Sequence, residues 1–475
     1  MTINSLNFIY FIIPLFILYY IKANKKWQNL IIFIGNLIFI TISDIKMFWC
    51  VVLLTITIHF LGLKIHNTKN IKKKKLFLSI GIIISLGMLI YFKYLNFFIS
   101  SLKNILSFTN WNLYTLNILI PLGISFYVFR SISYLVDIYR NNIIPRNNIC
   151  DVFIYTCFFP TYLSGPIDRA ITFFTQLDNP RLFNYSTIVI GCRQILWGIF
   201  KKVVIADNLA ITVNNIWSDL SIQSSSNLII VSILYFFQLY MDFSGYSDMA
   251  IGVGKLLGID ITKNFKYPFF SRNIAEFWRR WHISLNNWFV QYLYIPLGGN
   301  RKGTIRTLIN TIIIFTLCGF WHGSSINYAL WGLFNGILFI PIILSGANKK
   351  YKNSIAGENK LYPGLKEISE IITTFILCTI GFIIFRAPNL SSLLHFFSSI
   401  INNWNIPSTS IWDNYANLCL LVIIIEWICR KQEFPLYNLN YTFSKLINPI
   451  IYIILVELIL HYGALISSSF IYAKF

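Results

Sequence analysis

The residues best suited to chemistry in this chain lie in one stretch, Glu276 to Gly323. It contains two histidines, His282 and His322, and a pair of arginines, Arg279 and Arg280, in a sequence that is 56% hydrophobic. An ionisable side chain in apolar surroundings costs free energy, so it is retained when it has a function. We therefore expect the active region of the protein in this stretch.

His322 is the stronger catalytic candidate of the two histidines. It follows an uncharged run, residues 308–320, and has Gly319 and Gly323 close on either side. An imidazole titrates near neutrality and can take a proton from a hydroxyl group, which is the role of a general base. The alternative is a histidine that is hydrogen-bonded inside a helix bundle without taking part in chemistry.

His282 lies directly after a run of aromatic and basic residues, 277–281. Such a run is typical of a membrane interface, where aromatic rings and long basic side chains bridge lipid and water. A catalytic role for His282 and an interfacial, structural role are both open.

Asp242 is a candidate for substrate binding, in a Ser/Gly/Tyr-rich segment directly after an apolar run. Its carboxylate could hold a hydroxyl substrate, or it could pair with Arg272, Arg279 or Arg280 and fix helix packing. Because buried carboxylates near basic residues normally serve as partners, we favour the pairing.

The eight cysteines include no C-x-x-C pair and most of them fall in apolar runs, so no metal site or disulfide framework is predicted. Cys318 lies four residues before His322 and would share its face on a helix. We interpret it as a small buried residue, with a Cys-His acyl-thioester pair as the alternative.

The composition identifies the class of protein. The chain has 475 residues, of which 17% are aromatic and only 12% charged, and its mean hydropathy is +0.62. These values predict a multi-pass membrane protein in a lipid bilayer, folded as a single transmembrane domain over residues 1–475. We expect about eleven transmembrane helices, with the shorter apolar runs forming re-entrant or interfacial helices.

The net charge of +21 could suggest nucleic acid, but the basic residues sit mostly in loops between apolar runs. The positive-inside rule explains that distribution better, so no nucleic-acid partner is expected. The loops after the first and third apolar runs are both rich in lysine, and two helices separate them. Both loops are therefore predicted to be cytoplasmic, with a retained first helix and the N-terminus outside.

The stretch around the two histidines resembles a known family. The segments 277–285, 294–301 and 321–323 resemble motifs of the membrane-bound O-acyltransferase (MBOAT) family, in its bacterial branch of alginate and peptidoglycan O-acetyltransferases. Further segments match in the expected order along most of the chain, and these are residues 121–127, 198–209 and 242–250.

This resemblance implies an all-α fold around a central funnel in the bacterial inner membrane, and an acyltransferase activity. It implies that His322 is the essential residue, and that His282 stands at a position where the family frequently has a second histidine. The donor would be acetyl-CoA, a substrate rather than a bound cofactor, attracted to basic cytoplasmic loops such as that with Lys201 and Lys202. An extracytoplasmic partner enzyme of the SGNH (Ser-His-Asp) type would then modify a polysaccharide.

Four residues complete the predicted site as candidates for substrate binding: Trp321, Asn286, Arg279 and Asp242. Asn286 and His282 could also support the oxyanion that develops during acyl transfer.

The expected final acceptor is peptidoglycan, with alginate or another exopolysaccharide as the alternative and teichoic-acid D-alanyl transfer as a third possibility within the family. A transporter or channel without chemistry is the competing class, because buried ionisable residues can also line a transport path.

Tyr472 lies in an aromatic tail at the end of the chain, which is similar to the tails of the bacterial acetyltransferases of the family. A phenol titrates near 10 and a thiol at about 8.5, so a phenyl ester can accept an acyl group from a thioester with little loss of transfer potential. Tyr472 is therefore a candidate acyl carrier. An aromatic anchor at the membrane interface is the alternative.

Overall fold

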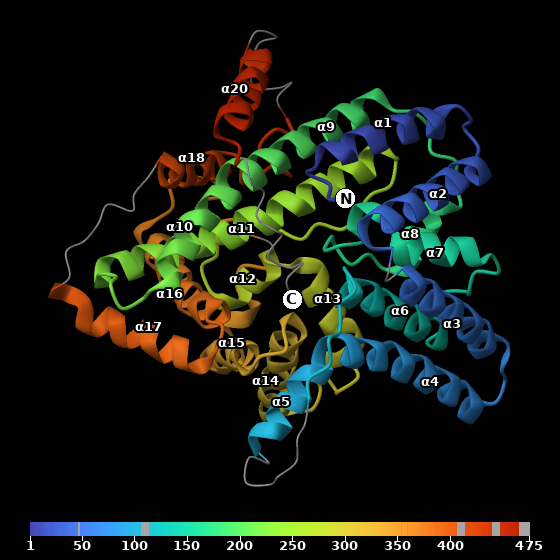
Figure 1. The fold of residues 1–475 in the computed structure, drawn as a ribbon, viewed down its shortest axis with the longest axis horizontal. Coiled ribbons are helices and arrows are strands. Elements are labelled where there is room, and N and C mark those ends of the chain that lie inside the picture. The colour runs from blue at the N-terminus through green and yellow to red at the C-terminus, as the bar shows by residue number, and fades with distance from the viewer. Residues whose placement is uncertain are drawn as a thin grey trace. The chain divides into compact units, whose positions relative to one another are not determined.

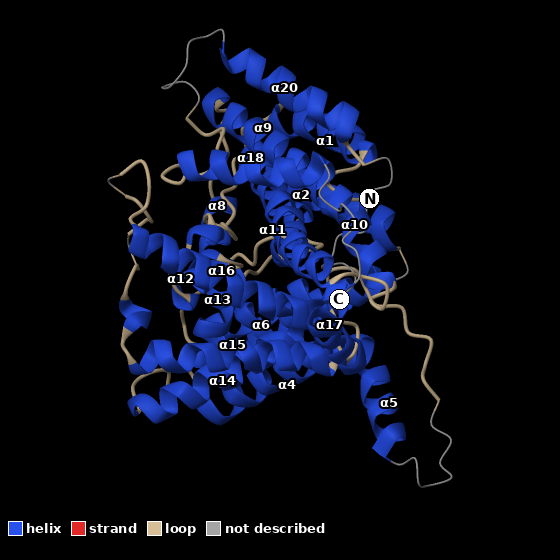
Figure 2. Cartoon of the chain, turned by 90° about the vertical axis from the view of Figure 1, so that its left-hand side faces the viewer, coloured by secondary structure: helices blue, strands red, loops and turns tan. Residues whose placement is uncertain are grey.

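The computed structural model of the protein describes residues 1–45, 48–105, 114–352, 354–358, 360–405, 414–438 and 447–464. Regular structure in these residues is helical throughout, and no strand occurs in them (Figure 2). The prediction of an all-α fold is confirmed. The chain forms two compact units, residues 1–191 with 250–262 and residues 192–249 with 263–475. That residues 1–475 act as one domain stays a prediction.

The first unit contains the helices at the N-terminal end of the chain, coloured blue to green in Figure 1. They are α1 (Leu6–Tyr20), α2 (Lys25–Asp44), α3 (Phe48–Asn67), α4 (Ile71–Leu89), η1 (Ile90–Tyr94), α5 (Leu95–Ile105), α6 (Ile124–Tyr139), α7 (Ile149–Cys157), η2 (Phe159–Thr161) and α8 (Ala170–Leu177). Most of α9 (Tyr185–Ile199) also belongs to it, as does the end of α11 (Ser225–Leu256).

The second unit contains the remaining helices and both histidines of the predicted site. Besides the rest of α9 and of α11, its elements are η3 (Phe200–Ala206), α10 (Asp207–Ser218), η4 (Pro268–Phe270), α12 (Ile274–Arg280), α13 (Ile283–Phe289), η5 (Val290–Tyr294), α14 (Gly303–His322), α15 (Ile326–Leu344), η6 (Ala347–Lys349), α16 (Leu365–Arg386), α17 (Leu390–Asn402), η7 (Asn403–Asn405), α18 (Asn414–Ile428) and α20 (Ile447–Tyr462).

Seven helices in the described part of the chain are long and apolar enough to cross a membrane: α2, α3, α4 with its continuation to Lys103, α11, α14, α15 and α16. The shorter apolar helices are α1, α7 with η2, and parts of α18 and α20. The prediction of about eleven crossings includes such short helices, some of which it treats as tilted or re-entrant.

The pattern of burial on the long helices suits a lipid environment. On α4, the side chain of Ile83 is 68% exposed, whereas Ser85 is fully buried and donates to the carbonyl oxygen of Gly81. A soluble protein would place these residues the other way round, because water favours the hydroxyl and excludes the alkyl group. The chain is thus a multi-pass membrane protein, as predicted.

Candidate active site

Helices α14 and α15 form a closely packed hairpin, and His322 is the last residue of α14, at the turn into α15. Both helices are labelled in Figure 1. A Cβ added at Gly319 would meet the carbonyl oxygen of Tyr328, and one added at Gly332 would meet the carbonyl oxygen of Phe315. Only glycine permits two backbones to approach in this way, and small residues are typical of such contacts between membrane helices. The hairpin therefore fixes the last turn of α14, which carries His322.

The imidazole of His322 lies in an aromatic box. Its ring centroid is 4.8 Å from that of Trp321, 5.2 Å from Trp331 and 5.3 Å from Phe385. Each of these rings is roughly perpendicular to the imidazole, and His322 is only 2% exposed. The structure thus buries the predicted general base among aromatic side chains of the protein.

His282 is positioned by the tight connection between α12 and α13. The backbone of His282 adopts a left-handed conformation, with φ of 46°, which reverses the chain between the two helices. Two backbone hydrogen bonds hold this turn from outside, since Lys266 N donates to Arg280 O and Ile283 N donates to Asn264 O. A left-handed backbone is rare for a residue with a Cβ and is often found at functional sites.

The two histidines meet at Trp321. The indole ring of Trp321 is 6.2 Å from the ring of His282 and 4.8 Å from that of His322. His282 also contacts Phe243 edge-on at 4.6 Å and is 1% exposed. Burial lowers the pKa of His282 to about 3, so its imidazole is neutral at physiological pH.

A pocket of about 760 Å³ opens in the second unit beside the same hairpin. Exposed Lys266, Asn300 and Lys352 line its outer part, and buried Trp278 and Cys318 line its inner part. This volume lies within the usual range for sites that bind small molecules and cofactors.

The inner end of the pocket is connected to the box around His322 by direct contacts. The rings of Trp278 and Trp331 lie 5.7 Å apart, and Trp331 in turn contacts His322. Cys318 lies one helical turn before His322 on α14. A ligand that fills the pocket would therefore end close to the predicted base.

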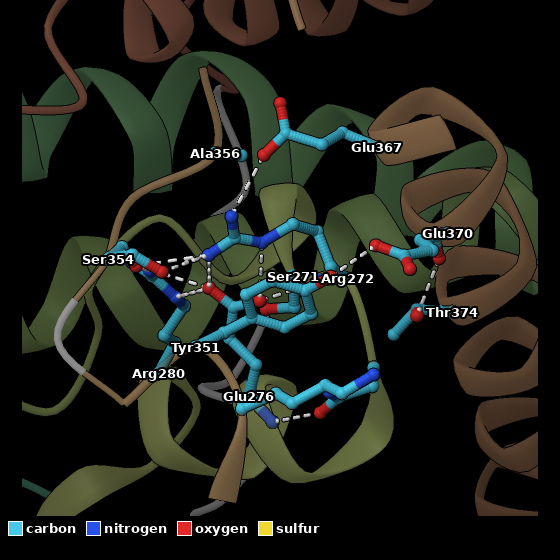
Figure 3. A network of polar contacts seen from close by, with 12 residues as sticks. Ser271, Arg272, Glu276, Arg280, Tyr351, Ser354, Ala356, Glu367, Glu370 and Thr374 are labelled. Carbon is cyan, nitrogen blue, oxygen red and sulfur yellow. Dashed lines mark hydrogen bonds and ion pairs between the residues drawn. The ribbon is translucent and has the colours of Figure 1, made fainter. Parts of the chain in front are cut away.

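One wall of the pocket is a network of charged side chains, shown in Figure 3. Glu276 accepts hydrogen bonds from Arg272, at 3.1 Å, and from Arg280, at 2.8 Å. Both arginines also donate to the carbonyl oxygen of Ser354 at 3.1 Å. The guanidinium of Arg272 lies 3.7 Å from the ring centroid of Tyr351, and the Tyr351 hydroxyl points away towards Glu370 (Figure 3).

Arg279, a predicted substrate-binding residue, holds the same loop from the opposite side. Its guanidinium donates to the carbonyl oxygens of Asn348, at 3.2 Å, and Lys350, at 2.9 Å, and it lines the pocket. The three arginines at positions 272, 279 and 280 thus attach the loop after α15 to α12. The sequence stretch alone did not predict this loop as part of the site.

Asn286 also lines the pocket, but its amide group is used within the protein. Its Nδ2 donates to the carbonyl oxygens of Trp278, at 2.6 Å, and Trp281, at 2.7 Å. Both N–H groups are therefore committed to the connection between α12 and α13, and the geometry gives no support to Asn286 as an oxyanion donor.

The structure offers a different donor, which sequence reasoning missed. Trp278 lines the pocket, and its buried indole N–H has no hydrogen-bond acceptor among the described residues. A buried donor of this kind is costly unless a ligand satisfies it. Its position within the aromatic run 277–281 was the only signal in the sequence, and that run indicated a membrane interface rather than a hydrogen-bond donor.

Asp242 is 1% exposed and forms an ion pair with Lys202 at 2.7 Å. Asp207 accepts from the same ammonium group at 2.7 Å. The structural pairing is thus the alternative that the geometry supports, although its partner is Lys202 and not one of the three arginines considered from the sequence.

The expectation that Lys201 and Lys202 form part of an exposed basic face is wrong. Each is 2% exposed, and Lys201 pairs with Asp248 at 2.6 Å. The π-helical turn η3 directs both lysines towards acidic residues of α11, which compensate their charge. These two lysines therefore do not supply the exposed positive charge that was expected to attract an anionic donor.

Tyr472 lies outside the described residues, so its role as an acyl carrier stays a prediction. Within the described part of the chain, no cluster of three or more histidine, cysteine or acidic side chains could hold a metal ion.

Comparison with known proteins adds a family to this geometry. The profile of MBOAT, the membrane-bound O-acyltransferase family, matches residues 37–347. The chain is 35% identical to the probable alginate O-acetylase AlgI of Pseudomonas putida, over 82% of this chain and 78% of the relative. It is 31% identical to the peptidoglycan O-acetyltransferase of Helicobacter pylori, over 92% and 90%. It is 29% identical to the teichoic acid D-alanyltransferase of Bacillus subtilis, over 57% and 69%.

Proposed function

Because the chain belongs to the membrane-bound O-acyltransferase family and is an O-acyltransferase, we propose that it transfers an acetyl group from cytoplasmic acetyl-CoA across the membrane for the O-acetylation of an extracytoplasmic polysaccharide. The observation that carries this proposal is the position of His322. It is buried in an aromatic box at the end of α14, while Cys318, one turn earlier, lines a pocket large enough for a donor. A transporter without chemistry has no support from the family.

The donor would occupy the pocket from its basic end. Lys266 and Lys352 are exposed there, and Arg279 lines the same pocket. None of these three forms an ion pair with a carboxylate of the described residues. Their charge suits the phosphates of acetyl-CoA, which is anionic. The CoA phosphates would thus stay at the rim while the thioester reaches inward.

The orientation of the hairpin agrees with such a path. Basic residues lie just before α14, at Arg301 and Lys302, and just after α15, at Lys349 and Lys350. By the positive-inside rule this end of the hairpin is cytoplasmic. Since α14 has 20 residues and each residue rises about 1.5 Å, His322 lies roughly 30 Å from that end. The lysine-rich loops after the first and third apolar runs separately support an extracytoplasmic N-terminus, and the proposed membrane is the bacterial inner membrane.

The reaction requires one base and one donor to the carbonyl. His322 takes the proton of the acceptor hydroxyl while the hydroxyl oxygen attacks the carbonyl carbon of the acetyl thioester. A C–O bond forms, the C–S bond breaks, and the departing sulfur takes the proton from His322. The indole N–H of Trp278 would donate to the carbonyl oxygen as negative charge develops on it.

Neutral His282 has a supporting role in this scheme. It also contacts Trp321, so it would help to fix the ring against which His322 packs. Together with Trp321 it would exclude water from the thioester, which would otherwise be hydrolysed.

The acetyl group would leave the protein on the extracytoplasmic side through Tyr472. Its phenol is a suitable first acceptor, because a phenyl ester preserves the transfer potential of the thioester. A separate extracytoplasmic transferase of the SGNH type would then move the acetyl group to the polysaccharide.

Peptidoglycan is the proposed acceptor. The peptidoglycan O-acetyltransferase of Helicobacter pylori is similar over 92% of this chain and 90% of its own length. Alginate or another exopolysaccharide is the second candidate, because the alginate O-acetylase of Pseudomonas putida has the higher identity, at 35%. The D-alanyltransferase of Bacillus subtilis matches only 57% of the chain, which makes D-alanyl transfer the weakest of the three.

The test of the proposed base is His322→Ala, assayed in membranes with radiolabelled acetyl-CoA. We expect acetyl transfer to fall by a factor of about 10² to 10⁴, the usual contribution of a general base, while the amount of folded protein stays unchanged. The matched control is His59→Ala, since His59 is also a buried histidine on an apolar helix, α3. Transfer at the parental rate in the His322→Ala variant would refute the assignment.

A further inference from the structure

A small pocket of about 200 Å³ lies between the end of α10 and the connection from α16 to α17. Polar side chains dominate its lining: Asn214, Ser218, Arg386 and Ser392, together with Trp217. All of these residues belong to the second unit, and none of them lines the pocket beside α14. The proposed reaction uses none of them.

The guanidinium of Arg386 is the only charged group that lines this pocket in the described chain. It donates to Asn214 Oδ1 at 2.9 Å and lies 5.0 Å from the ring centroid of Trp217. No carboxylate of the described residues lies within ion-pair distance of it. Asp219, next to the lining residue Ser218, instead accepts from the backbone and hydroxyl of Ser221. Arg386 is thus a half-buried cation with neutral partners.

Two further features favour an anion at this place. Ser392 lines the pocket, and its hydroxyl group can donate a hydrogen bond, whereas the hydroxyl of Ser218 already donates to the carbonyl oxygen of Asn215 at 2.6 Å. Ser392 also lies in the first turn of the 13-residue helix α17, which begins after the cap residue Asn389. The positive end of the helix dipole therefore adds to the charge of Arg386.

The size and lining of the pocket favour a side chain over a sugar ring. The indole of Trp217 is already stacked on Phe396, with ring centroids 4.7 Å apart and planes 9° apart, and Arg386 lies over the same ring system. These two contacts already use the indole ring on which a pyranose would stack. A carboxylate on a short side chain fits the available donors, and an arginine can bind it with two parallel hydrogen bonds.

The pocket lies close to the box around His322. Arg386 directly follows Phe385, whose ring is 5.3 Å from that of His322. Helices α14 and α16 both begin next to basic loops and end at His322 and Arg386. If the proposed function holds, Arg386 therefore lies on the extracytoplasmic side, where the acetyl group leaves.

We propose that this pocket anchors an extracytoplasmic partner protein by binding one of its aspartate or glutamate side chains to Arg386. The carboxylate would accept hydrogen bonds from the N–H groups of Arg386 and from the hydroxyl of Ser392. Such a contact has the character of an interface hot spot, with an arginine and a tryptophan in a small, partly enclosed pocket. It would hold the partner next to the point at which the acetyl group emerges.

The test measures binding to the full-length protein in lipid nanodiscs. The probes are a fluorescent eight-residue peptide that alternates glutamate and glycine, the same peptide with glutamine, and a uronic acid hexasaccharide. We expect the glutamate peptide to bind at least about tenfold more tightly than the glutamine peptide, because hydrogen bonds to a charged group are worth more than neutral ones. Binding of the hexasaccharide in preference to the peptide would overturn the proposal, as would equal binding of both peptides.

Three variants locate the site. Arg386→Gln should weaken binding of the glutamate peptide by at least about tenfold. Asn214→Asp, at an exposed position of α10, should weaken binding of the glutamate peptide by a similar factor, because the new carboxylate would form an ion pair with Arg386. The matched control is Arg146→Gln, since Arg146 also lies over an aromatic ring, Phe174, but is already paired with Asp178. Unchanged binding in folded Asn214→Asp protein would overturn the proposal even if Arg386→Gln failed to fold.

The same assay separates this inference from the proposed function. His322→Ala should bind the glutamate peptide like the parent, although its acetyl transfer should be lower by a factor of about 10² to 10⁴. If the parent protein transfers acetyl groups but does not bind the peptide, only the proposed binding of a partner at Arg386 is refuted. If the parent protein binds the peptide but transfers no acetyl group, only the proposed function is refuted.

Discussion

His282 and His322 contact the same indole ring, yet their surroundings suit different tasks. His322 ends a long apolar helix, next to the residues that line the larger pocket. His282 sits in a left-handed turn outside the helices that are long enough to span a membrane, and burial keeps it neutral. The difference arises from the elements that carry the two imidazoles, because the side chains themselves are identical.

The lowered pKa of His282 predicts how stability depends on pH. The folded-state pKa of about 3 lies below the ordinary value of 6.5, so the unfolded chain binds an extra proton between these values. The contribution of neutral His282 is complete above pH 6.5 and is lost as the pH falls towards 3, by up to about 1.4 kcal/mol per pH unit. Thermal unfolding is measured in detergent at pH 7.5, 6.0 and 5.0. The unfolding temperature should decrease less with falling pH for His282→Gln than for the parent. Equal decreases would contradict the assignment.

Trp278 provides a second prediction for a single residue. Trp278→Phe keeps an aromatic ring against Trp331 but removes the N–H group that lines the pocket. Loss of one oxyanion donor typically costs a factor of about 10² to 10³ in rate, so kcat for acetyl transfer should fall while KM for acetyl-CoA changes little. Trp197→Phe is the control, because Trp197 is equally buried but does not line the pocket. A change in KM alone would assign Trp278 to binding instead.

Among the helices, the decisive element is the hairpin of α14 and α15. Its glycines bring the two backbones together, and the last turn of α14 then presents His322 to rings from α15 and α16. The short helix α12 has the complementary task, since its arginines hold the loop that lines the larger pocket. Each element thus positions one part of the site.

Gly332→Ala tests the role of the hairpin. The added Cβ would meet the carbonyl oxygen of Phe315, so the helices must separate, and such overpacking typically costs about 1–3 kcal/mol. We expect a lower unfolding temperature and lower acetyl transfer. The control is Gly87→Ala on α4, where a Cβ meets nothing within 4 Å and alanine should be neutral or stabilising by up to about 1 kcal/mol. If Gly332→Ala unfolds at the parental temperature, the close approach does not hold the hairpin.

For the whole molecule, the proposed reaction has two ends. The proposed donor pocket lies beside the basic end of the hairpin. His322 and Arg386 are the last residues of α14 and α16, at the ends of these helices away from the basic loops. Between them stands a buried imidazole surrounded by aromatic rings. This arrangement suits an enzyme that accepts an acyl group on one face of a membrane and releases it on the other.

Tyr472→Phe tests the release. The variant keeps an aromatic ring for anchoring but lacks the oxygen that would carry the acetyl group. If Tyr472 is the carrier, acetylation of the cell-surface polysaccharide should disappear while the protein level stays constant. Tyr462→Phe, at the end of α20, is the matched control. Unchanged acetylation in Tyr472→Phe would leave only the anchoring role.

The sequence by itself determined the class of the protein and the residues at its centre. Apolar runs and scarce charges demand a helical membrane protein, because only helices satisfy every backbone group within one segment of lipid-embedded chain. His322 and His282 stood out for a related reason, since imidazoles in such surroundings are costly. The sequence motifs around the two histidines indicated the family.

The tertiary structure decided which partners these residues have. Lys201 and Lys202 looked like a basic loop, but the π-helical turn η3 buries them against acidic residues of α11. Phe385, far from His322 in sequence, closes its aromatic box. Such contacts depend on how helices pack and on the direction of each side chain, and neither property can be read from hydrophobic periodicity within a single segment.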